Sequence, residues 1–202
     1  MKHLVFLMGI FLSAHALARP PVPVIPQNQY LTSVDYAKEG EQTGCGLRII
    51  GETEDNLWIN VLVSVFTRES GTLYGMFKVV AKKIIMQDDE PLIQDGKVMY
   101  SSIGKIHKAW IKTDSGVQPV THEGGESPHN DGYMAALEFD NAAKLLIALP
   151  QENFTVGFSK MEDGFEETFE FNKRMPRNEA NKLSACMRNL RGTREERRDK
   201  SF

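Results

Sequence analysis

The clearest pattern in the chain is an alternation of apolar and other residues between positions 57 and 67. Asn60 and Ser64 lie on one side of this alternation, whereas the other side holds Leu57, Ile59, Val61, Val63 and Val65. A period of two residues is the signature of a β-strand, because successive side chains of a strand point to opposite faces. We therefore expect a strand with one apolar and one half-polar face, near the middle of an antiparallel sheet.

Weaker strand patterns surround this segment. A slip in the alternation near Val80 predicts a β-bulge, and the turn residues Asp95-Gly96 and Asp114-Ser115-Gly116 predict two later hairpins. Besides the central segment, the strands expected before residue 122 cover residues 30–37, 45–50, 73–86 and 103–112, with 103–112 paired to 117–121. This part of the chain therefore reads as an antiparallel β-meander.

The pattern changes after residue 132. Asp140 is a candidate cap for a short apolar helix that Pro150 terminates, and Gly192 is a candidate end for a longer amphipathic helix. The expected elements are a strand at 133–139, a helix at 141–149, an aromatic hairpin with strands around 154–158 and 165–171, and a helix at 177–191. The predicted fold is α+β: an antiparallel β-meander followed by a strand–helix–β-hairpin–helix unit.

The first 18 residues look like a signal peptide. Lys2 precedes an apolar core at 4–12, and Ala16 and Ala18 offer the small residues that a signal peptidase reads. Nine apolar residues are too few to cross a bilayer as a helix, which needs about 20. A retained anchor is the alternative. The expected location is periplasmic or secreted, with no integral membrane segment after processing.

The expected organisation is a proline-rich extended arm at 19–30, a single α+β domain at 31–192 and a disordered basic tail at 193–202. Charge is unevenly distributed over these parts. Residues 172–202 hold ten Lys/Arg and four Asp/Glu, a net of +6, which leaves −10 for residues 19–171. A basic end on an acidic body is either a solvated tail or a binding element.

The sequence contains two cysteines, Cys45 and Cys186. Two cysteines in an exported chain usually form one disulfide, and both lie in apolar surroundings, Cys45 beside a predicted strand and Cys186 on the apolar face of the last helix. A catalytic thiol would need a basic or histidine neighbour that the local sequence does not supply. We therefore expect a structural bridge between the first part of the domain and its last helix.

Two segments are candidates for binding another protein. The arm contains Pro20, Pro21, Pro23 and Pro26, and such an extended segment either occupies a partner's groove or serves as a spacer. On the last helix, Arg177, Arg188 and Arg191 fall along one edge of the apolar face. They can hold an anionic partner, or lay their stems over apolar surface and pair with nearby acids.

One loop is a candidate metal site. His122, Glu126, His129 and Asp131 supply the imidazole and carboxylate ligands that zinc prefers, although glycines in the loop leave the geometry unfixed. The alternative is a set of solvated loop residues. An S-x-x-K match at 102–105 stands in a predicted strand, where that motif requires a helix, and no phosphate-loop, dinucleotide or nucleophile-elbow motif is present.

These observations favour an exported, non-enzymatic binding or assembly protein of the bacterial cell envelope, for instance in a secretion or conjugation apparatus. Its expected partner is another envelope or surface protein, and no cofactor is expected. Nucleic acid is not expected, because the basic C-terminal region has almost no interleaved aromatic residues. The alternatives are a metal-dependent hydrolase built on the 122–131 loop and an exported toxin or inhibitor.

Overall fold

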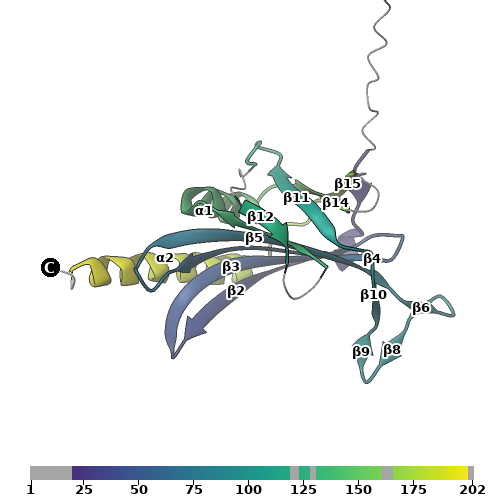
Figure 1. Ribbon diagram of the computed structural model, residues 1–202, viewed down its shortest axis with the longest axis horizontal. Helices are drawn as coiled ribbons and strands as arrows, with labels where there is room; N and C mark the ends of the chain where they lie inside the picture. The colour runs from purple at the N-terminus through teal and green to yellow at the C-terminus, as the bar shows by residue number, and fades with distance from the viewer. Residues whose placement is uncertain (1–19, 119–122, 128–130, 161–165, 200–202) are drawn as a thin grey trace, which may run out of the picture.

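The computed structural model describes residues 20–118, 123–127, 131–160 and 166–199 of the chain. The expected signal peptide lies outside these residues. The described part is an α+β structure in which one long antiparallel sheet, a smaller second sheet and two α-helices surround a common core (Figure 1). The α+β class expected from the sequence is confirmed.

The long sheet contains the central strand of the fold. Its strands follow the order β12-β13-β5-β4-β3-β2, and β10 pairs with the far end of β5. These strands are β2 (Tyr30–Lys38), β3 (Glu41–Glu52), β4 (Leu57–Thr67), β5 (Leu73–Ile84), β10 (Tyr100–Ser102), β12 (Glu123–Glu126) and β13 (Tyr133–Leu137). The alternating segment from the sequence is β4, which lies between β3 and β5, so its expected place inside a sheet is confirmed.

The second sheet follows the order β1-β15-β14-β11. Its strands are β1 (Val22–Pro23), β11 (Ile106–Thr113), β14 (Phe154–Lys160) and β15 (Glu166–Phe171), with β1 parallel to β15 and the other pairs antiparallel. Two small hairpins, β6 (Met86–Gln87) with β7 (Glu90–Pro91) and β8 (Ile93–Gln94) with β9 (Lys97–Val98), lie between β5 and β10 in the chain. The hairpin predicted at Asp95-Gly96 is therefore confirmed.

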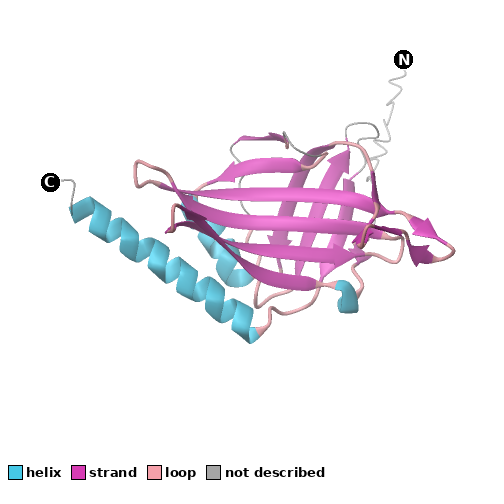
Figure 2. Ribbon diagram, turned by 90° about the horizontal axis from the view of Figure 1, so that it is seen from below, coloured by secondary structure: helices cyan, strands magenta, loops and turns pink. Residues whose placement is uncertain are grey.

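Helices lie on the same side of the long sheet as the second sheet does. Helix α1 (Phe139–Ala148) packs on β4 and β5, and α2 (Arg177–Asp199) packs on β2 and β3, while a single 3₁₀ turn, η1 (Pro26–Asn28), precedes β2. In Figure 2 the long sheet faces the viewer with the second sheet behind it. One face of the long sheet is thus covered by the rest of the chain and the other is not covered by any described helix or sheet.

We call the covered face the inner face. It carries the apolar set of β4 together with Leu47, Ile49, Phe77 and Val79, and all but Leu57 of these side chains are fully buried. The second sheet meets them with stacked aromatic pairs, Phe154–Phe171 and Phe158–Phe169, with ring centroids 4.9 and 5.3 Å apart. The expected core role of these aromatic residues is confirmed, whereas Phe165 lies outside the described residues.

The opposite face is the outer face. Because directly paired residues share a face, the β-ladder assigns to it Arg48, Trp58, Asn60, Leu62, Ser64, Phe66, Lys78, Val80 and Lys82, among others. Most of these side chains are partly exposed, although Ser64 and Val80 are buried. The half-polar face expected for the central strand is this surface.

Three sequence-based expectations are corrected: the β-bulge near Val80, the partner of the strand at 103–112 and the end of the C-terminal helix. The ladder between β4 and β5 runs without a register shift, so there is no bulge near Val80. Strand β11 pairs with β14, and the described residues 117 and 118 of its expected partner form no strand. The register with β14 sets Ala109 and Ile111 beside Phe158 and Val156 in the core. Within the described chain no helix is long and apolar enough to span a membrane.

The third correction concerns the C-terminal helix. Helix α2 continues through Gly192 to Asp199, whereas the sequence suggested an end at Gly192 and a disordered tail. Glycine ends a helix when it takes a positive φ, and Gly192 does not. The following residues, TREERRD, are mostly strong helix formers, so one glycine is not enough to stop the helix.

Candidate functional site

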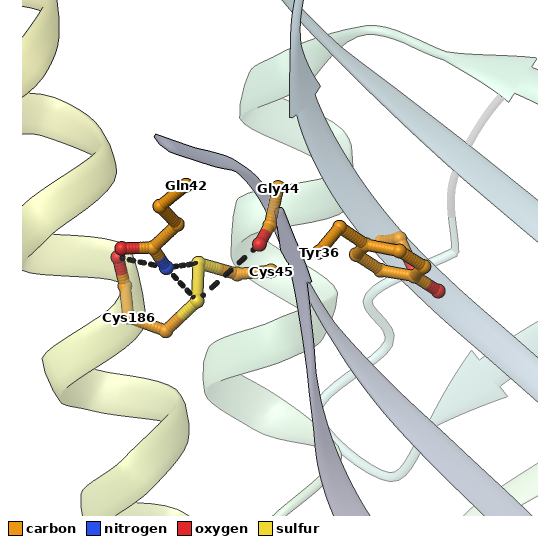
Figure 3. Close-up of a disulfide and its surroundings, with 6 residues drawn as sticks. Tyr36, Gln42, Gly44, Cys45 and Cys186 are labelled. Atoms are coloured by element: carbon orange, nitrogen blue, oxygen red, sulfur yellow. Dashed lines mark hydrogen bonds between the residues drawn. A yellow bond between two sulfur atoms is a disulfide. The ribbon is translucent and has the colours of Figure 1, made fainter. Parts of the chain in front are cut away.

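The disulfide predicted between Cys45 and Cys186 is present and joins β3 to α2 (Figure 3). Both cysteines are buried, with their Cα atoms 5.9 Å apart. The Gln42 side-chain amide lies over the bridge and also donates to the carbonyl oxygen of Cys186, at 3.4 Å. The bridge therefore fixes α2 on the inner face, in the structural role expected from the sequence.

The proline-rich arm is folded onto its own domain. Val22 and Pro23 form β1 beside β15, and Val24 is buried, with its N–H donating to Glu170 O at 3.1 Å. Pro20, Pro21, Pro23 and Pro26 themselves are exposed. The arm is therefore partly a strand of the second sheet, and its proline rings lie on the surface.

Gln29 holds the end of the arm in place. Its side chain is fully buried; the amide nitrogen donates to Val24 O at 2.9 Å, and the amide oxygen accepts from the N–H groups of Asn172 and Lys173. Each of these bonds replaces water for a buried polar group, which is why a buried glutamine is tolerated. The arm is thus tied to the segment that leads into α2.

The predicted arginine edge borders a groove between α1 and α2. The groove has a volume of about 620 Å³ and lies where Met175 N–H donates to Pro150 O, at the junction of the two helices. Its lining is Leu146, Ile147, Pro150, Gln151, Met175, Arg177, Ala180, Leu183, Ser184, Met187 and Arg188. The floor is mostly apolar, and two of the three predicted arginines lie at its rim.

Arg177 and Arg188 are both exposed, and neither forms an ion pair with any described carboxylate. Arg188 donates to the hydroxyl of Ser184 at 2.8 Å, one turn earlier on the same helix. The side chain of Arg191 lies outside the described residues. Most N–H donors of these two guanidinium groups therefore have no acceptor in the described chain and can bind an external acceptor.

Ile147 is the groove residue that the sequence reading missed. Its side chain is 62% exposed, although it belongs to a short helix whose neighbouring residues Leu145 and Leu146 are buried. A continuous Leu-Leu-Ile run on a helix cannot turn all three side chains to one side. This run was the available signal that α1 presents an apolar residue away from the sheet.

The predicted metal loop is described only in part. His122 and His129 lie outside the described residues, as does the side chain of Glu126. The carboxylate of Asp131 accepts from the Ser102 hydroxyl, and its backbone oxygen accepts from Ile106 N–H. Among the described residues no three metal-ligating side chains come together, and the four-residue metal site stays a prediction.

Comparison of the chain with protein-family models, with curated proteins and with solved structures gave no significant match in any of the three.

Proposed function

We propose that this chain is an exported bacterial envelope protein, periplasmic or secreted, which acts by binding another envelope or surface protein. A disulfide that joins two distant parts of a domain is typical of oxidising compartments. The observation that carries the binding role is the groove between α1 and α2, with its apolar floor and two arginines that form no ion pair with a described carboxylate.

The occupant that fits this groove is an acidic, amphipathic segment of a partner protein. Such segments dock by laying an apolar face into a groove formed by helices, and Met175 and Met187 provide a lining that adapts to different side chains. Acidic residues flanking the apolar face would meet Arg177 and Arg188, whose guanidinium groups bind carboxylates with two hydrogen bonds. Exposed Ile147 supplies an apolar contact at the α1 side.

Photo-crosslinking from position 147 tests this proposal. The exported protein, with benzoylphenylalanine at position 147 and the rest of its sequence unchanged, is irradiated in the producing cells. The expected product is a covalent adduct with a protein of one defined mass. The double variant Arg177→Glu/Arg188→Glu should lose this adduct, because it turns an attractive rim into a repulsive one. The control Lys108→Glu/Lys112→Glu makes the same charge change on the exposed side of β11 and should keep it.

Thermal melting separates binding from packing. Arg177→Glu/Arg188→Glu should melt within about 2 °C of the β11 control, because surface substitutions usually change stability little. An adduct that survives the arginine reversal, or a melting temperature clearly below that of the control, contradicts the proposal. Cell fractionation and intact mass check the export part: the mature chain should begin at Arg19 and be lighter than the reduced chain by the two hydrogen atoms lost in forming the disulfide.

A further inference from the structure

The outer face of the long sheet holds a second site, on the opposite side of the sheet from the groove. A cleft of about 230 Å³ crosses β3, β4 and β5 there. It is lined by Arg48, Trp58, Asn60, Leu62, Lys78, Val80 and Lys82. These residues converge only because the antiparallel ladder brings alternate positions of three strands to one face.

The cleft contains three cations that have no partner in the described part of the chain. Arg48, Lys78 and Lys82 form no ion pair or side-chain hydrogen bond with any described residue. Two described carboxylates lie near these cations. That of Glu52, across the ladder from Trp58, accepts a hydrogen bond from the Asn28 amide at 3.1 Å, and that of Asp131 accepts one from the hydroxyl of Ser102, which pairs with Lys82. Three like charges on one sheet face give the cleft a positive potential, which attracts an anion.

One lining residue of the cleft, Asn60, has a polar atom that needs a hydrogen-bond donor. The side-chain oxygen of Asn60 is buried, and no described group donates a hydrogen bond to it. A buried carbonyl oxygen without a partner costs about 1–3 kcal/mol. A simple anion such as sulfate brings no donor for this oxygen. The ligand that completes the site therefore carries both anionic oxygens and hydroxyl or amide donors.

The indole of Trp58 adds an apolar surface to the same cleft. Its ring is half-buried, and Tyr100 stands tilted against it with centroids 5.3 Å apart. The cations are also spread out: Arg48 and Lys78 lie two strands apart, about 10 Å, and Lys78 and Lys82 lie four residues apart on one strand, about 13 Å. This spacing fits charges that repeat along a chain better than one compact ion.

We propose that the outer-face cleft binds an acidic polysaccharide whose sugar rings carry carboxylate or sulfate groups. A sugar ring places its C–H face on Trp58, and its acidic groups lie on Arg48, Lys78 and Lys82. The Asn60 oxygen is buried in the unbound structure, so the Asn60 side chain turns towards the cleft to accept a hydrogen bond from a sugar hydroxyl. Acidic polysaccharides belong to the outside of cells, in keeping with a disulfide-bonded domain. This site is independent of the α1–α2 groove, so either assignment can fail alone.

Tryptophan fluorescence measures the binding directly. The oxidised protein with Trp110→Phe keeps Trp58 as its only tryptophan and is titrated with polygalacturonate, dextran sulfate, neutral dextran and polyphosphate. At least one acidic polysaccharide should change the Trp58 emission and saturate, neutral dextran should not, and polyphosphate should bind at least tenfold more weakly. Added salt should weaken the binding, because the cations are solvent-accessible.

Two substitutions separate a sugar site from a patch of positive charge. Lys78→Glu should weaken polysaccharide binding at least tenfold, and Lys112→Glu on β11 should leave it unchanged. Asn60→Leu alters no charge and should weaken the binding about tenfold, with a melting temperature equal to or above that of the parent.

Several results would overturn the assignment. The first is that Asn60→Leu binds the polysaccharide as well as the parent does. The second is that polyphosphate or single-stranded DNA binds as tightly as the polysaccharide, and the third is that neither acidic polysaccharide shows saturable binding. Binding lost in Arg177→Glu/Arg188→Glu but kept in Lys78→Glu would assign the polysaccharide to the groove and α2 instead.

Discussion

The inner and outer faces of the long sheet are built from alternate residues of the same strands, yet their surroundings differ completely. On the inner face, Leu47 and Val63 belong to the core that the long sheet shares with the two helices and the second sheet, and both are fully buried. On the outer face, the adjacent Arg48 and Leu62 line an open cleft. Burial of one face provides the stability, and the other face is left free to carry charge.

Because β3 has glycine at two positions, side chains of the neighbouring strand β4 can cover part of the outer face without a helix. A Cβ at Gly46 would come 2.3 Å from the Ser64 hydroxyl, and one at Gly44 would come 2.6 Å from the Phe66 ring. Phe66 therefore lies over β3, where its ring is tilted against that of Tyr36 and stacked with that of Tyr74, with centroids 4.7 and 5.5 Å apart. Aromatic side chains therefore cover the end of the outer face around Phe66, whereas Arg48, Lys78 and Lys82 line the cleft beside Trp58 towards the other end.

The largest predicted effect is loss of the disulfide, which attaches α2 to the inner face. Cys45→Ser/Cys186→Ser should lower the free energy of unfolding by up to about 5 kcal/mol, because the bridge closes a loop with a sequence separation of 141 residues. Urea unfolding of the oxidised protein and the double variant measures it. A change below about 1 kcal/mol would show that packing alone holds α2 in place.

The second prediction compares the same substitution on the two faces. Leu47→Ala should cost about 2–5 kcal/mol, because it opens a cavity in the inner-face core. Leu62→Ala, on the neighbouring strand but on the outer face, should cost about 1 kcal/mol or less, since its side chain is already partly in water. Equal losses in chemical denaturation would remove the distinction between the faces.

The third prediction concerns the close approach of α1 to β5. Gly75→Ala should destabilise the protein by about 1–3 kcal/mol, because the new Cβ would lie 2.4 Å from that of Ala142 and push the helix off the inner face. Gly125→Ala on β12, where a Cβ meets nothing within 4 Å, is the matched control and should be nearly neutral. Calorimetric melting of both variants checks the difference.

The smallest predicted effect is a pH dependence where α2 meets the edge of the sheet. Lys182 at 2.7 Å, together with the N–H and hydroxyl of Ser33, lowers the pKa of Glu179 to about 2. Because the pKa is lowered on folding, the stabilisation is present above the ordinary value of 4.5 and is lost as pH falls through about 2.

Glu179→Gln should therefore be less stable than the wild type by about 1 kcal/mol at pH 7, a figure that allows for solvent screening at this edge. The difference should shrink towards zero near pH 2 in urea titrations at both pH values. A difference that does not vary between pH 7 and pH 2 would assign the effect to lost packing and not to the charge. Lys97→Gln, on the exposed β8–β9 hairpin, controls for removal of a surface charge.

The sequence predicted the parts of the fold whose signals are local. The ends of β4 follow from its alternation, and the Cys45–Cys186 bridge follows from two cysteines in apolar surroundings. The partner of β11 could not be predicted in the same way. The Asp114-Ser115-Gly116 turn favours a local hairpin, but the register against Phe154–Lys160 buries more apolar surface, and that gain depends on residues over 40 positions away.

The candidate sites were predictable to different degrees. Arg177 and Arg188 lie on one helix, so helical spacing alone placed them on a common edge, but not beside Ile147, which depends on how α1 packs. The outer-face cleft was missed because Arg48, Trp58 and Lys78 lie on three strands and look like ordinary exposed residues in each. In the sequence the basic residues cluster in the C-terminal region, whereas the fold brings Arg48, Lys78 and Lys82 together beside Trp58 on the sheet.

The Cys45–Cys186 bond also makes most of the domain a covalent ring. The segment between the two cysteines contains the whole of β4, β5, β11, β13, α1 and β14. A protease that cuts one peptide bond in any of the loops between these elements would open the ring without releasing a fragment. The nicked protein would run as one species until a reductant is added, and then as two.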